Sequence, residues 1–277
     1  MAQILDRLLG LDDLTRKNTA VLKPSPSDAW SNAEIIERMK TAPELPDSMV
    51  NVGNPEALPW GDVYILCSDT VVKRCAEVSA PAPEATVLSF VHQHTSIPVP
   101  RVRRYVPNKW YGYLLMEKIP GKRLDTLWPS YSPLQKFLAA WTLRGYVRQL
   151  RQASAAYNRR HIPGPMSKKL EKSFWHFSTS KMTKKRSDYS QPSTPLDDSQ
   201  PLVLTHGHIR LRNVIVGDDG KLWLTGWPWA AFYPPYFEYI ATMSAADADE
   251  ADHSWIKHIP IVTNGAYRKE LEYIVGV

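Results

Sequence analysis

The sequence predicts an α+β protein with two lobes, a small β-rich lobe followed by a larger, mainly helical one. Between residues 62 and 119, apolar residues mostly recur at every second position, which is typical of strands, and one stretch with helical spacing interrupts them. From about residue 120, apolar residues recur at steps of three and four, as on an amphipathic helix. We therefore expect an N-terminal helical extension at 1–48, a β-sheet lobe with one helix at 49–120, and a helical lobe at 121–277.

Composition and charge narrow the class of protein. With 277 residues, 43% of them hydrophobic, the chain can bury a sizeable core. A net charge of +6 is a mild excess for this length and does not predict nucleic-acid binding. Asp6 and Arg7 interrupt the apolar start that a signal peptide needs, and no apolar run approaches the roughly 18 residues of a membrane span. Cys67 and Cys75 lack C-x-x-C spacing, so we expect buried free thiols in a cytoplasmic protein without a membrane partner.

Two helices are expected in the N-terminal extension. Leucines at helical spacing predict an amphipathic helix over 3–16 that docks on the body of the protein. A second, short helix should begin near Ser31, because serine is a good N-cap in front of "NAEIIERMK". The proline-rich stretch 41–60 is expected to be irregular.

The β-rich lobe should contain a hairpin, a helix and two further strands. "DVYIL" at 62–66 and "TVVKRC" at 70–75 flank the turn-forming pair Ser68-Asp69 and predict the hairpin. "PEATVLSFVHQHT" at 83–95 has helical spacing, with Pro83 in the first turn. "IPVPRVRRYV" and "YGYLLMEKI" are then predicted as strands joined by a turn.

The helical lobe begins after a connection, "MEKIPGKRL", in which Gly121 should supply the bend. Residues 133–154 carry apolar positions at helical steps for about six turns. Residues 164–200 are rich in Lys, Ser and Pro and predict a solvated segment, with a basic lid over an anionic ligand as the alternative.

A polar loop between two apolar runs is the main candidate for a functional site. In "LTHGHIRLRNVIVGDDGKLWLTGW", residues 204–227, a strand leads into the loop and a hairpin around "DDG" follows it. Such a loop holds His206, His208 and Asn213 at a fixed edge, which suits chemistry. The alternative is that His206 and Asn213 only satisfy backbone groups of the loop.

From about residue 50 to about residue 260, the chain resembles the aminoglycoside phosphotransferase-like family, related to choline kinases and more distantly to protein kinases, and above all its fungal branch. The matching pieces occur in the family's order: "VVKR", "EATVLSFVHQHTSIPVPRV", "YLLMEKIPGKRLDTLWPSYS", "HGHIRLRNVIV" and "LTGWPWAAFYPPYFEY". The resemblance implies a two-lobed, protein kinase-like fold. It also implies that Lys73 matches the nucleotide-binding lysine, Glu84 its glutamate partner, Asn213 a metal ligand and His206 the structural histidine of the loop.

The chain departs from the family at both catalytic carboxylates. His208 replaces the aspartate that accepts the hydroxyl proton, and Gly226-Trp227 replaces the metal-binding Asp-Trp. Mg²⁺ needs hard oxygen ligands, so we expect no metal site and no cofactor. The turn before residue 62 offers only Gly61, next to Trp60, where a phosphate loop needs several glycines, and this argues against ATP binding.

Three functions remain open. In the first, the chain has lost kinase chemistry and holds a small apolar metabolite in the interlobe cleft, as a cyclase or isomerase of fungal secondary metabolism that positions a reactive conformer. His208 is then the candidate catalytic residue, and the expected cleft residues are Lys73, Glu84, Asn213, Gly226, Trp227, Trp229 and Tyr233.

The second function is a regulatory pseudokinase that binds nucleotide or a partner protein, and the third is an unorthodox small-molecule kinase. The basic segment 168–186 would serve as a docking surface if the chain is a regulatory pseudokinase. Lys73 and Glu84 could equally be a structural ion pair. The aromatic residues are more often part of a core than of a ligand site. The oligomeric state stays open.

Overall fold

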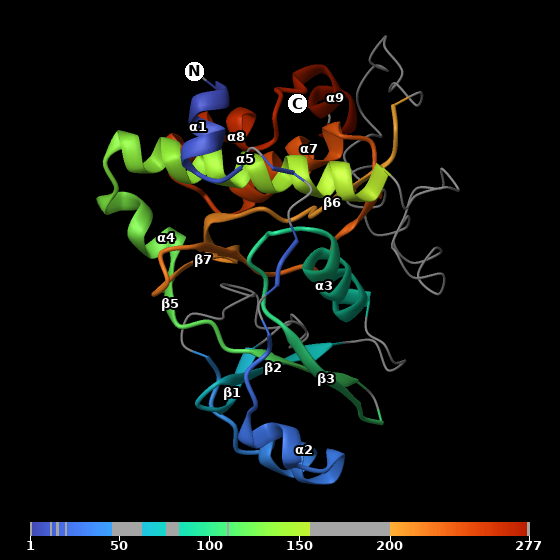
Figure 1. The fold of residues 1–277 in the computed structure, drawn as a ribbon. Coiled ribbons are helices and arrows are strands. Elements are labelled where there is room, and N and C mark those ends of the chain that lie inside the picture. The colour runs from blue at the N-terminus through green and yellow to red at the C-terminus, as the bar shows by residue number, and fades with distance from the viewer. Residues whose placement is uncertain are drawn as a thin grey trace.

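The computed structural model describes residues 2–11, 13–14, 17–19, 21–45, 63–75, 83–109, 111–155 and 200–275. It confirms the expected α+β class: a small antiparallel sheet with its helices is followed by a mainly helical part (Figure 1). The expected boundary at 48/49, most of the irregular stretch 41–60, the turn at Gly61 and the basic segment 168–186 lie outside the described residues.

The N-lobe sheet has four strands in the order β1-β2-β4-β3, all antiparallel. The strands are β1 (Val63–Cys67), β2 (Thr70–Cys75), β3 (Val102–Pro107) and β4 (Gly112–Glu117). The expected hairpin is confirmed, with Ser68-Asp69 as its turn. Since β4 is paired on both sides and covered on both faces, its residues are almost all buried.

Each face of this sheet packs against a different helix, as the two-residue period of a strand requires. Val71 and Leu114 share a core cluster with α3 (Pro83–His94). Their neighbours Val72 and Leu115 face the other way, into a cluster with α2 (Asn32–Arg38). The predicted helix start at Ser31 is confirmed, because its hydroxyl and the Glu34 carboxylate form a reciprocal capping box.

The N-terminal helix is shorter than predicted: α1 spans Ala2–Leu8 and not 3–16. Gly10 has φ +64°, a left-handed conformation that suits glycine, and ends the helix. The Gly10 N–H donates to Arg7 O at 3.1 Å and the Leu11 N–H to Asp6 O at 2.6 Å, the bonds of a Schellman motif. A short 3₁₀ helix, η1 (Pro26–Ala29), precedes α2.

The connection between the lobes is more ordered than the predicted bend. Residues Gly121–Arg123 form β5, which pairs with β7 (Val214–Gly217), and β7 pairs with β8 (Leu222–Leu224). The chain continues through α4 (Leu124–Leu127) and η2 (Trp128–Ser130). The long helix predicted at 133–154 is confirmed as α5 (Pro133–Ala155).

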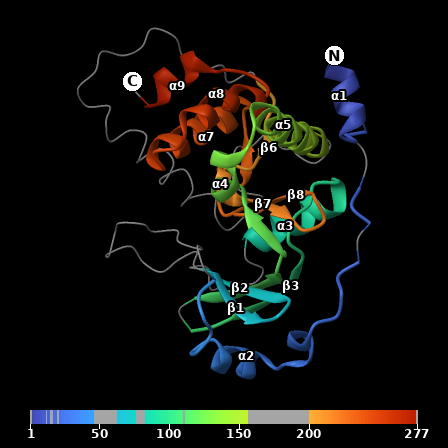
Figure 2. The same cartoon turned by 90° about the vertical axis from the view of Figure 1, so that its left-hand side faces the viewer.

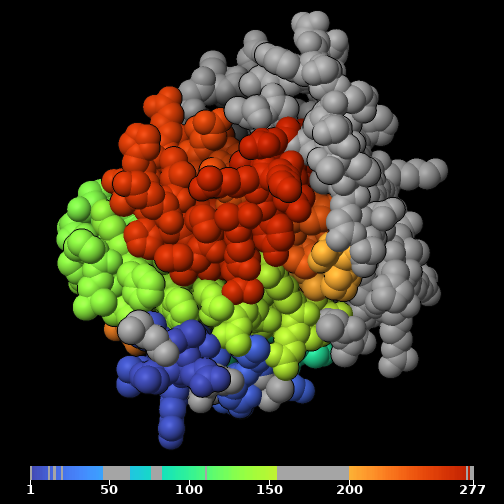
Figure 3. All heavy atoms as spheres, turned by 90° about the horizontal axis from the view of Figure 1, so that it is seen from above, coloured from blue at the N-terminus to red at the C-terminus, as the bar shows by residue number. Residues whose placement is uncertain are grey.

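The rest of the C-lobe surrounds the loop of interest. A second small sheet pairs β6 (Val203–Thr205) with β9 (Ala231–Tyr233), and η4 (Leu211–Asn213) leads into β7. Helices α7 (Tyr236–Ala248), α8 (His253–Val262) and α9 (Arg268–Val275) complete the lobe. Seen from above, α7, α8 and α9 form one face next to α5, with the N-terminal residues at its edge (Figure 3).

The cysteines are free, as predicted, but they are half-buried rather than buried. The Cys67 thiol donates to the Asp69 carboxylate at 3.1 Å. Burial raises the pKa of Cys75 to about 12. Within the described part of the chain, no helix is long and apolar enough to cross a membrane.

Candidate functional site

Two loops and two N-lobe elements form the candidate site. Loop 206–213 joins β6 to β7, and loop 225–230 joins β8 to β9. Lys73 lies on β2 and Glu84 in the first turn of α3. The structure brings the predicted residues together in two groups, which meet at the adjacent residues Gly226 and Trp227.

The first group is held by one buried carboxylate. Lys73 Nζ donates to Glu84 Oε2 at 2.7 Å, and the Trp227 N–H donates to Glu84 Oε1 at 3.0 Å. Lys73 is 9% exposed and Glu84 is 6% exposed. Glu84 therefore joins strand β2 of the N-lobe to the loop after β8 of the C-lobe, through an ion pair on one oxygen and a backbone hydrogen bond on the other.

His206 is fully buried and supports the loop. Its Nε2 lies 3.0 Å from the Thr225 carbonyl oxygen, and its Nδ1 accepts the His208 N–H at 3.1 Å. Since a carbonyl only accepts and an N–H only donates, these contacts fix the neutral ring with its proton on Nε2. Burial and, to a smaller extent, the charge of Lys73 lower the pKa of His206 to about 3, although the hydrogen bond to Thr225 raises it.

Glu238 of α7 accepts hydrogen bonds from the backbone of the same turn. Its two carboxylate oxygens accept the backbone N–H groups of His206 at 2.6 Å and Gly207 at 3.0 Å. Burial raises the pKa of Glu238 to about 7, although these hydrogen bonds and the charge of Arg151 lower it. Sequence reasoning missed this residue, although a lone acid within the apolar run "PYFEYIATM" was a usable signal.

His208 has one ring nitrogen occupied by a side-chain contact. Asn213 Nδ2 donates to the His208 carbonyl oxygen at 2.8 Å and lies 3.1 Å from His208 Nδ1. The carbonyl fixes the amide orientation, so Nδ1 accepts and Nε2 carries the proton. Burial, followed by the charges of Arg210, Arg212 and Lys73, lowers the pKa of His208 to about 2. His208 is thus a neutral hydrogen-bond donor through Nε2–H and not a general base.

The space beside Gly226 is occupied by the Asn213 amide. Gly226 has φ +74°, and a Cβ added there would lie 2.8 Å from Asn213 Cγ and 2.9 Å from Asn213 Nδ2. A side chain at position 226 would require the Asn213 amide to move, and that amide directs its donors at His208. The residues present therefore do not fit Mg²⁺, which needs converging oxygen ligands.

Two acidic residues of the described C-lobe, Asp219 and Asp249, are engaged in other contacts. Asp219 Oδ1 is held inside the hairpin turn, where it accepts the Lys221 N–H and the Trp223 Nε1–H, each at 3.1 Å. Asp249 pairs with Arg210 at 2.6 Å and Arg212 at 3.3 Å. Over the described ranges, no group of three or more His, Cys, Asp or Glu side chains could hold a metal ion.

The predicted aromatic residues divide between core and site. Trp227 is 1% exposed, packs edge-on against His206 and donates its indole N–H to Leu224 O. Tyr233 is buried and stacks on Phe237 with ring centroids 4.6 Å apart. Trp229 alone of these three is half-buried, and its ring meets that of His208 edge-on at 6.5 Å.

The sequence matches no family model, and a search of curated proteins gives no match. Solved structures that are similar in fold include the macrolide 2'-phosphotransferase MphH from Brachybacterium faecium, with 16% identity, a TM-score of 0.47, and coverage of 88% of this chain and 87% of that one. The aminoglycoside phosphotransferase APH(3'')-Id from Streptomyces rimosus has 16% identity and a TM-score of 0.46, over 77% of this chain and 88% of that one. At these values neither similarity indicates what this chain binds.

Proposed function

We propose that this chain is a phosphotransferase-like protein that does not transfer phosphate and instead holds a small, largely apolar molecule in the interlobe cleft, next to His208 and Trp229. The observation that carries the proposal is the Asn213 amide, which donates to His208 and fills the space beside Gly226. This arrangement removes both the proton acceptor and the metal ligand of phosphoryl transfer.

The fixed tautomer of His208 defines the chemistry of the ligand. Its Nε2–H can donate to a carbonyl or ether oxygen, and Trp229 offers an aromatic surface beside it. With a pKa lowered to about 2 by burial and neighbouring cations, the His208 ring stays neutral near neutral pH. A reaction at this site, such as a cyclisation or isomerisation, would proceed by holding the reactive conformer rather than by proton transfer. A cytoplasmic role in fungal secondary metabolism is part of this proposal.

Native mass spectrometry of the purified protein, before and after denaturation, tests the proposal by showing which small molecules co-purify. We expect an apolar molecule with an oxygen acceptor to be retained by the unaltered protein and lost from His208→Ala and Trp229→Ala. The matched control Trp223→Ala changes an indole in the β7–β8 hairpin and should retain it. Equal retention in all variants, or Mg²⁺-dependent ADP production, contradicts the proposal.

A regulatory pseudokinase is the second candidate, and the intact Lys73–Glu84 pair favours it. In this alternative, Lys73 contacts the phosphates of a nucleotide while Glu84 orients it. Calorimetry with ATP, with and without Mg²⁺, separates the two candidates. Heat of binding that is lost in Lys73→Met supports the pseudokinase, and no heat at millimolar nucleotide excludes it.

A further inference from the structure

The N-terminal residues lie across both lobes. From α1, beside α5, the chain descends along one side of the molecule to η1 and α2 next to the N-lobe sheet (Figure 2). We call the described residues between 2 and 31 the N-terminal strap. It is anchored on each lobe by a cluster of buried or half-buried contacts.

The C-lobe anchor is formed by α1 on one face of α5. Asp6, 8% exposed, accepts the Trp141 Nε1–H at 2.9 Å and pairs with Arg148 at 2.7 Å. Leu11 packs on Gly145, where an added Cβ would lie 2.7 Å from Leu11 Cδ2. Positions 141, 145 and 148 lie four and three residues apart, so they share one face of the helix. The anchor therefore fixes α1 in position and orientation.

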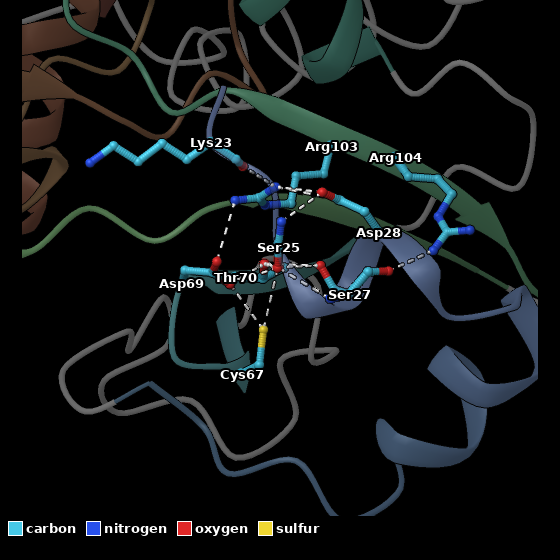
Figure 4. Close-up of polar contacts among 9 residues, drawn as sticks. All are labelled: Lys23, Ser25, Ser27, Asp28, Cys67, Asp69, Thr70, Arg103 and Arg104. Atoms are coloured by element: carbon cyan, nitrogen blue, oxygen red, sulfur yellow. Dashed lines mark hydrogen bonds and ion pairs between the residues drawn. The ribbon is translucent and has the colours of Figure 1, made fainter. Parts of the chain in front are cut away.

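The N-lobe anchor centres on a buried hydroxyl. Ser25 Oγ donates to Asp69 Oδ1 at 2.7 Å and lies 2.9 Å from Thr70 Oγ1 and from Ser27 Oγ (Figure 4). The Thr70 hydroxyl and the Cys67 thiol also donate to Asp69. Asp69 lies in the β1–β2 turn and Thr70 begins β2, so this cluster attaches the strap to the sheet.

Two arginines of β3 add a second layer to this anchor. Arg103, whose side chain is 3% exposed, donates to Lys23 O at 3.1 Å and pairs with Asp28 at 3.3 Å. Arg104 donates to the carbonyl oxygen of Ser27 at 3.0 Å (Figure 4) and to that of Trp30 at 2.7 Å. Between the anchors, the Asn18 N–H donates to Thr95 O, just beyond α3, at 2.7 Å.

We infer that the strap restrains movement of the N-lobe sheet relative to the helical lobe and so regulates the opening of the site that contains Lys73, Glu84 and Trp227. Lys73 belongs to the sheet that the strap holds, and Glu84 bonds it to the Trp227 N–H of the C-lobe. The inference rests on the proposed function only for the identity of the molecule that enters when the lobes separate.

A strap restrains motion only while both of its ends are attached. Releasing either anchor should therefore free the sheet, and releasing the second should add little. If the two substitutions acted independently, their effects on the amide exchange rate would multiply, because substitutions at distant sites ordinarily add in free energy. The Trp227 amide is the natural reporter, since its hydrogen bond to Glu84 crosses between the lobes.

Amide hydrogen exchange of the full chain, followed by NMR, tests the inference. Asp6→Asn removes the charge of the C-lobe anchor, and Ser25→Ala removes the hydroxyl of the N-lobe anchor. Asp218→Asn and Ser89→Ala make the same chemical changes at exposed positions and serve as controls. Exchange of the Leu115 amide in the central strand β4 monitors global stability.

Each anchor variant should speed exchange of the Trp227 amide by about tenfold or more, while Leu115 and both controls change by less than about twofold. The double variant should exceed the faster single variant by less than about twofold. The inference is overturned if Trp227 exchanges no faster than in the controls, if Leu115 accelerates equally, or if the double variant shows the product of the single effects. The assay needs no ligand, so its failure and a failure of the ligand proposal are separate results.

Discussion

The side-chain amide of Asn213 lies where a side chain at position 226 would have to lie. An added Cβ at Gly226 would come within 3.0 Å of three Asn213 atoms, Cγ, Nδ2 and Oδ1. His208, Asn213 and Gly226 therefore form one local arrangement: the Asn213 amide contacts His208 on one side and occupies the space beside Gly226 on the other.

This relationship predicts the effect of a methyl group at Gly226. Gly226 and Gly220 have nearly the same φ, +74° and +75°, but nothing lies within 4 Å of a Cβ added to Gly220. Alanine strains the backbone equally at both positions, so the difference isolates the clash. We expect Gly226→Ala to lower the free energy of unfolding by about 1–3 kcal/mol more than Gly220→Ala, measured by urea denaturation. Equal losses would mean that Asn213 moves away without penalty.

Replacing Asn213 by aspartate should favour the protonated, charged form of the His208 ring. A carboxylate near Nδ1 favours the protonated ring, so we expect the pKa of His208 in Asn213→Asp to rise by at least about one unit from its value lowered by burial. NMR titration of the ring measures the change, with Asn264→Asp as the matched control. An unchanged pKa of the His208 ring would show that the side chain at position 213 does not act on Nδ1.

Removing Lys73 should destabilise the protein beyond the loss of one contact. Lys73→Met leaves the Glu84 carboxylate buried without its cation, which costs about 3–5 kcal/mol. The double variant Lys73→Met, Glu84→Gln keeps an acceptor for the Trp227 N–H and removes the unpaired charge. It should therefore recover part of the lost free energy of unfolding in the same denaturation experiment. A double variant less stable than Lys73→Met would contradict this account of the pair.

The buried histidines predict that stability falls in mild acid. Burial lowers the pKa of His206 to about 3 and of His208 to about 2, from about 6.5 when unfolded, so the unfolded state binds the extra protons as pH falls below 6.5. Each histidine then lowers the free energy of unfolding by about 1.4 kcal/mol for each unit by which the pH falls.

Glu238 acts in the opposite direction. Its pKa, raised by burial to about 7 from 4.5, makes a stabilising contribution that is full below 4.5 and is lost as pH rises to 7. Two histidines outweigh one glutamate, so the free energy of unfolding should rise from pH 4.5 to 6.5. Glu238→Gln should steepen that rise, measured by denaturation across the pH range, and an unchanged slope would show that Glu238 does not titrate there.

The sequence predicted best the elements whose signals are local. The Ser31 cap, the Ser68-Asp69 turn and the long α5 helix follow from short-range rules and appear where expected. The end of α1 was missed because the leucine spacing continues past Gly10, whose backbone conformation ends the helix. Strands β5 and β9 were not predicted, because β5 lies in the connection where a bend was expected and β9 lies within the aromatic run that follows Trp227.

The candidate site was predictable in its members but not in its geometry. Lys73, Glu84 and His208 were identified by position, and the Lys73–Glu84 contact exists. The contact between Asn213 and Gly226 depends on a backbone angle at 226 that no sequence pattern specifies. The support from Glu238 joins residues 32 positions apart and depends on how α7 packs.

Gly145 in the middle of α5 has a practical consequence for protein preparation. Glycine weakens a helix by about 1 kcal/mol relative to alanine, and here its small size admits Leu11. A shortened chain beginning after Asn18 would keep Gly145 in the helix and expose the apolar surface of α5 between Trp141 and Arg148 that Leu11 covers. Such truncations should aggregate more readily than the longer chain, so trimming the N-terminus to aid crystallisation would work against its purpose.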